Sequence, residues 1–106
     1  MDQLTDWNAV AKFYDRFRQC DDGGIAEGAS DAIGQLLARE QPDVETLARS
    51  MRSRRGMRHF ILRHVDATLS DDDLRVIADQ LPGRCDARNG RLCQALSSAA
   101  RRALLE

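Results

Sequence analysis

The sequence predicts an all-α protein, a compact single-domain bundle of five or six short helices over residues 1–106. Three observations support this prediction. Apolar residues recur at spacings of three and four along almost the whole chain, which is the period of one helix face. Alternating runs rich in Val, Ile, Thr and aromatic residues, the usual signal of a strand, are nearly absent. The length of 106 residues fits one domain with a single modest core.

The first helix is expected over residues 5–19, with Thr5 as its N-cap and the paired glycines after Asp22 ending it. Its inward positions are Trp7, Val10, Phe13 or Tyr14, and Phe17. Phe13 and Tyr14 are neighbours and cannot both point fully inward. Either one of them lies on the surface as an interface anchor, or both edge into the core.

The second helix is expected over residues 25–39, although Gly28 and Gly34 weaken it. It therefore either spans this range or begins only at Ser30, acting as N-cap. Its inward positions are Ala29, Ala32, Ile33, Leu36 and Leu37. The next helix should begin after Asp43 as N-cap, with Val44, Leu47, Ala48 and Met51 facing inward.

Gly56 should end that helix, and a further one should bury Met57, Phe60, Ile61 and Val65. The segment "TLSDDDL" is the clearest helix start, because Ser70 is a good N-cap and aspartates favour the first turn. The last helix carries Leu92, Leu96, Ala99, Ala100 and Ala103, a seam suited to a bundle core or a dimer. "RNG" at 88–90 is either a turn before this helix or a weak point within a longer one.

Charge alternates along the chain, although the net charge is only −1. Residues 1–45 hold ten acidic and four basic side chains, whereas residues 46–65 hold six arginines and no acidic residue. Residues 66–83 hold five acidic residues against one arginine, and residues 84–106 hold five arginines against two acidic residues. Either the arginine-rich segment binds phosphates or an acidic protein surface, or it is a solvated face that its neighbours neutralise.

The candidate site is an arginine-rich helical corner within residues 49–63. On one continuous helix, Arg52 and Arg55 would lie within about 60° of each other, with Arg49 about 60° beyond Arg52. Because Gly56 interrupts the helix, two smaller clusters meeting at a helix–helix corner are also compatible with the sequence. The partner-binding candidates are Arg49, Arg52, Arg55, Arg58 and Arg63.

The function expected from this pattern is that of a small non-enzymatic regulatory or adaptor protein that binds an acidic surface of another protein. The acidic N-terminal third is also compatible with head-to-tail self-association, and hence with a homodimer. The alternative partner is nucleic acid, bound by the same arginines, although the balanced total charge argues against it. Fifteen of the sixteen basic residues are arginine, which indicates a GC-rich bacterial genome.

Catalytic and cofactor motifs are absent, so neither an enzyme nor a cofactor is expected. No metal site is expected either: His59 and His64 would lie about 140° apart on a helix. They are interpreted as packing or surface residues.

The odd count of cysteines argues for free, buried thiols at Cys20, Cys85 and Cys93. A disulfide between Cys85 and Cys93 would need a bend near residues 89–90 and an oxidising setting. No signal peptide or membrane-spanning run is recognised, so we expect a cytoplasmic protein without membrane contact.

Overall fold

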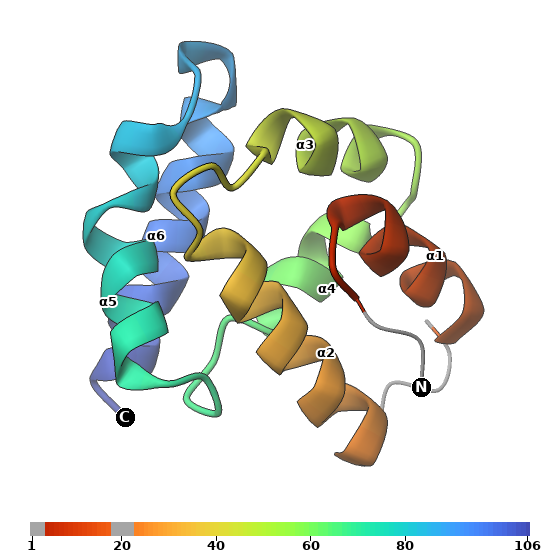
Figure 1. Cartoon of the computed structure of the whole chain (residues 1–106), viewed down its shortest axis with the longest axis horizontal. Coiled ribbons are helices and arrows are strands. Elements are labelled where there is room, and N and C mark those ends of the chain that lie inside the picture. The colour runs from red at the N-terminus through yellow and green to blue at the C-terminus, as the bar shows by residue number, and fades with distance from the viewer. Residues whose placement is uncertain (1–3, 18–22) are drawn as a thin grey trace.

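The computed structural model describes residues 4–17 and 23–106, and this part of the chain forms six α-helices and no strand (Figure 1). The helices are α1 (Trp7–Phe17), α2 (Gly23–Leu37), α3 (Val44–Arg52), α4 (Met57–Arg63), α5 (Asp71–Asp79) and α6 (Gly90–Leu104). Two short 3-10 helices, η1 (Leu81–Arg84) and η2 (Ala87–Asn89), connect α5 to α6. The prediction of a compact all-α bundle is confirmed.

The helices α5 and α6 lie side by side and antiparallel at one edge of the molecule, with η1 and η2 between them (Figure 1). Ser70 caps α5 as predicted, since its Oγ accepts a hydrogen bond from the backbone N–H of Asp73 at 3.1 Å. Ser97 on α6 donates its hydroxyl to the carbonyl of Ala78 on α5 at 2.6 Å. The predicted seam of α6 is buried along its length, at Leu92, Leu96, Ala99, Ala100 and Ala103. This seam therefore serves the core.

The helix α1 packs against α3 and is anchored by two aromatic residues (Figure 1). The indole Nε1 of Trp7 donates to the carbonyl of Pro42 at 2.6 Å, just before α3 begins. Tyr14 is buried, whereas Phe13 is partly buried at the edge of the core and packs on Phe17 at 5.0 Å between ring centroids. Tyr14 is thus the inward member of the pair, and Phe13 edges into the core beside it.

One predicted N-cap is wrong, and another caps its helix without a side-chain hydrogen bond. At α1 the cap is Asp6 and not Thr5, because the Asp6 Oδ1 accepts the N–H of Ala9 at 2.8 Å. Asp43 is the N-cap residue of α3, as predicted, but its backbone is left-handed, with φ of 52°, and its side chain makes no capping hydrogen bond. The predicted end of the first helix at Gln19 lies outside the described residues.

The helix α2 runs through Ser30, so the alternative start at that residue is wrong. Ser30 instead lies in the core, with its Oγ 2.8 Å from Nδ1 of His64, and both side chains are buried. Gly34, which weakens the helix on sequence grounds, is where α2 meets Leu69. A methyl group at this position would overlap the Leu69 side chain, so the glycine permits a close contact.

The prediction of free thiols is wrong for two of the three cysteines. Cys85 and Cys93 form a disulfide, with their Cα atoms 6.7 Å apart. On one continuous helix the eight intervening steps would separate them by about 12 Å. The 3-10 turn η2 and the start of α6 at Gly90 provide the bend that shortens this distance. Cys20 lies outside the described residues.

Candidate functional site

The arginine-rich stretch is divided by the end of α3 and the start of α4. Its six arginines fall into pairs: Arg49 and Arg52 on α3, Arg54 and Arg55 in the turn, and Arg58 and Arg63 on α4. Because α3 ends at Arg52, the expectation that Arg52 and Arg55 share one helix face is wrong. Gly56, with φ of 85°, sets the change of direction between the two helices.

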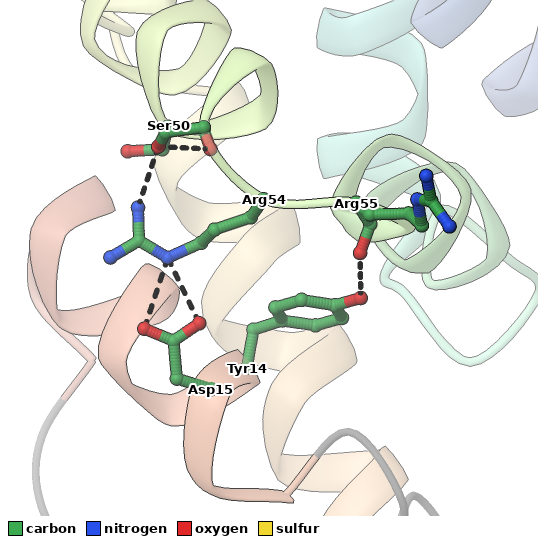
Figure 2. A network of polar contacts seen from close by, with 6 residues as sticks. Tyr14, Asp15, Ser50, Arg54 and Arg55 are labelled. Atoms are coloured by element: carbon green, nitrogen blue, oxygen red, sulfur yellow. Dashed lines mark hydrogen bonds and ion pairs between the residues drawn. The ribbon is translucent and has the colours of Figure 1, made fainter.

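The turn between α3 and α4 is fixed onto α1. Figure 2 shows Arg54 directed at Asp15, with its Nε 3.0 and 3.1 Å from the two carboxylate oxygens. Beside this pair, Tyr14 donates its hydroxyl to the backbone carbonyl of Arg55 at 2.6 Å. The Arg55 side chain is exposed and extends away from Asp15 (Figure 2). The side chain of Arg54 and the backbone carbonyl of Arg55 therefore both fix the turn to α1.

Glu45, in the first turn of α3, brings together the basic residues of two distant segments. Arg49 and Arg52 reach its carboxylate from α3, with Nη2 at 3.7 and 3.6 Å from Oε2. From η2, the Nε of Arg88 lies 3.9 Å from Oε1, and Asn89 donates its Nδ2–H to the same oxygen at 3.1 Å. Asn89 is itself buried, so this hydrogen bond is the inner link between η2 and α3.

These contacts lower the pKa of the Glu45 carboxyl below its ordinary value. The hydrogen bond from Asn89 is the largest cause, and the positive charges of Arg88, Arg52 and Arg49 act in the same direction. Partial burial opposes them by favouring the neutral acid. Glu45 is therefore ionised at neutral pH, and its single negative charge is shared among three arginines.

Next to Glu45 lies a shallow hollow of about 330 Å³, which we call the basic hollow. Its lining residues are Arg52, Arg58, Arg88, Arg91, Asn89, Ala48, Met51 and Leu92. The four arginines are exposed, whereas Ala48 and Leu92 are buried and Met51 is partly buried. The hollow thus combines guanidinium groups from α3, α4, η2 and α6 with an apolar floor.

The basic hollow contains only part of the predicted site. Arg52 and Arg58 line it, and Arg49 is connected to it through Glu45. Arg55 and Arg63 do not line it. Sequence reasoning missed Arg88 and Arg91, although the basic excess of residues 84–106 was the available signal.

In the part of the chain that the structure describes, no group of three His, Cys, Asp or Glu side chains is arranged to hold a metal ion. No helix among the same residues is long and apolar enough to cross a bilayer. Comparisons with protein-family models, curated proteins and solved structures find no match to this chain. The basic hollow is therefore interpreted from its own chemistry.

Proposed function

We propose that this protein is a small, non-enzymatic, cytoplasmic regulator or adaptor that binds an acidic segment of another protein at the basic hollow. The observation that carries the proposal is the gathering of four exposed arginines from separate elements around one hollow. Arginines placed close together repel one another, and a negatively charged ligand offsets this repulsion. Guanidinium groups pair well with carboxylates, often through two parallel hydrogen bonds.

Glu45 indicates what kind of anion suits these arginines. A carboxylate of the chain itself already occupies the position between Arg49, Arg52 and Arg88. Arg58 and Arg91 also line the hollow and form no ion pair with Glu45. We therefore expect carboxylates of the partner to contact Arg58 and Arg91 first, with Arg52 and Arg88 completing the site.

The apolar floor favours a protein segment over a nucleic acid. Ala48, Met51 and Leu92 provide a small patch on which an aliphatic or aromatic side chain can be buried between flanking carboxylates. A phosphate backbone has no apolar group to bury on this floor and would gain little from it. The preferred ligand is an acidic segment with one apolar residue near its centre.

The test uses a fluorescent peptide in which a central leucine is flanked on each side by two glutamates. Its affinity is measured by anisotropy for the wild-type protein and for the double variant Arg58→Glu/Arg91→Glu. Reversal of both charges should weaken binding by about tenfold to a hundredfold, as for charge pairs at an interface. A peptide with alanine in place of the leucine should bind several-fold more weakly.

The matched control is Arg75→Glu/Arg102→Glu, which makes the same change of charge at exposed positions outside the hollow. This variant should bind the peptide within about twofold of wild type. An equal loss in both variants would contradict a local site. Tighter binding of a single-stranded oligonucleotide, with a steep loss in salt, would replace the protein partner by nucleic acid.

A further inference from the structure

The disulfide closes the segment that carries one side of the basic hollow. Cys85 follows η1 directly, and Cys93 lies in the first turns of α6. Between them lie Arg88, Asn89 and Arg91, all of which line the hollow. The bridge therefore restrains the same nine-residue loop that presents two of the four arginines.

Without the disulfide, few polar contacts would hold this loop against α3. The side chain of Asn89 is bonded to Glu45, and the N–H of Asn89 donates to the carbonyl of Asp86 at 2.9 Å within the loop. The ion pair between Arg88 and Glu45 is long, and the Arg88 side chain is largely exposed, so it adds little. The position of Arg88 thus depends mainly on Asn89 and on the covalent bridge, whereas Arg91 lies in the first turn of α6, which is also held by the buried side chains of Leu92 and Cys93.

The two sulfur atoms differ in access. Cys85 is partly buried and lines a second hollow of about 260 Å³, between residues 40–45 and η1–η2. Cys93 is fully buried in the core. A thiol arriving from solvent can therefore approach the sulfur of Cys85 and not that of Cys93, which makes Cys93 the leaving group.

We propose that the Cys85–Cys93 disulfide is a redox switch that controls the basic hollow. The choice of hollow rests on the proposed function, whereas the release of the loop on reduction does not. In the oxidised form the loop presents Arg88 and Arg91 beside Arg52 and Arg58. In the reduced form the loop moves more freely. The conformational entropy that is lost when the partner orders the loop then weakens binding.

The chemistry is exchange with a low-molecular-weight thiol. Its thiolate attacks Sγ of Cys85, the bond to Cys93 breaks, and the Cys93 sulfur leaves as a thiolate and takes up a proton. A second thiol displaces Cys85 from the mixed disulfide and leaves it as a thiol. Two small thiols are thereby oxidised to one small disulfide, and the reverse exchange restores the bridge. Cytoplasmic disulfides are usually transient, as such a switch requires.

The structural arm of the test measures amide hydrogen exchange in the oxidised protein and after reduction by dithiothreitol. A Cys20→Ser background removes the third thiol. Exchange in residues 86–92 should be about tenfold faster after reduction, because local opening of the loop requires less free energy. Protection in α3 and the second half of α6 should persist, which shows that the domain remains folded. Equal exchange in both states would overturn the proposal.

The binding arm uses the leucine-centred acidic peptide. Reduction should weaken its binding by about tenfold, the effect expected when two arginine side chains and their loop must be ordered on binding. The variant Cys85→Ala/Cys93→Ala should bind with the weaker affinity and show no response to dithiothreitol. A second variant, Arg88→Ala/Arg91→Ala, keeps the bridge and should also lose most of the response.

The two proposals fail in different ways. If the peptide binds equally well to the oxidised and reduced proteins, the redox switch is wrong and the proposed function stands. If the peptide binds to neither form while residues 86–92 still respond to reduction, the proposed function is wrong and the switch acts on the hollow for another ligand.

Discussion

At the residue scale, Glu45 is the carboxylate around which the basic hollow is organised. The hydrogen bond from Asn89 and the charges of Arg88, Arg52 and Arg49 hold its pKa in the folded protein below that in the unfolded chain. Such a group stabilises the folded state above its unfolded pKa, and this stabilisation is lost as the pH falls through the folded pKa. Acid should therefore weaken the link between α3 and η2.

The substitution Glu45→Gln removes this titration. The free energy of unfolding of the variant should fall less steeply than that of wild type between about pH 5 and pH 3, where glutamates protonate. Urea unfolding measured across this range gives the slopes. Glu40→Gln is the matched control, since it makes the same change at an exposed position and should leave the slope nearly unaltered. Identical slopes for wild type and Glu45→Gln would show that the contacts of Glu45 do not stabilise the fold.

At the scale of elements, the junction of α3 and α4 determines where Arg58 lies. Gly56 adopts φ of 85°, a region in which a residue with a Cβ is strained. A Cβ atom here would also lie 2.7 Å from the hydroxyl oxygen of Tyr14. That hydroxyl makes the hydrogen bond to the carbonyl of Arg55. Backbone conformation and packing on α1 thus both require glycine.

We expect Gly56→Ala to lower the free energy of unfolding by about 1–2 kcal/mol, the cost of placing an L-residue in the left-handed region. The contact with Tyr14 adds to this cost. Gly83→Ala is the control, because a Cβ atom there meets nothing within 4 Å, and its effect should stay within about 0.5 kcal/mol. Chemical denaturation of both variants measures the difference, and equal effects would mean that the α3–α4 junction tolerates a side chain.

The elements themselves could be predicted because their signals are local. The aspartates after Ser70 and the spacing of Met57, Phe60 and Ile61 act within one or two turns, and the structure agrees with both. The failures concern choices that depend on neighbours. Asp43 caps α3 as predicted, but its left-handed backbone and the missing side-chain hydrogen bond have no signal in the local sequence.

At the scale of the whole molecule, the candidate site could be predicted only in part. Arg52 and Arg58 are close in sequence and could be predicted, whereas Arg88 and Arg91 reach the same hollow through the packing of η2 beside α3 and of α6 beside α4. The disulfide depends on the same turn geometry. Neither the meeting of these segments nor the bend has a periodic signal in the sequence. The sequence therefore shows the excess of positive charge in residues 84–106 but does not show where these residues lie in the folded protein.

Folding also sorts the alternating charges into two adjoining hollows. The hollow beside Cys85 is lined by the carboxylates of Glu40, Asp43, Glu45 and Asp86. Its one arginine, Arg84, donates to the backbone carbonyl of Arg39 at 2.9 Å. Glu45 lies between this acidic hollow and the basic one, and Asn89 lines both. The partly buried Cys85 thus lies among carboxylates, while the loop that its disulfide restrains carries the arginines Arg88 and Arg91.

This arrangement predicts that the charge of a thiol determines how fast it reduces the disulfide. Cysteamine, a cation, should react about threefold faster than the anionic 3-mercaptopropionate at low ionic strength, compared at equal thiolate concentration and corrected for intrinsic nucleophilicity. The difference should shrink as added salt shortens the Debye length.

The variant Asp43→Asn/Asp86→Asn should also reduce the difference in rate between the two thiols, since both carboxylates line the hollow beside Cys85. The rates are measured by rapid mixing with each thiol, trapping of the freed protein thiols at set times, and mass spectrometry of the trapped protein. Equal corrected rates at low salt would mean that the thiol reaches the bridge by a path outside the acidic hollow.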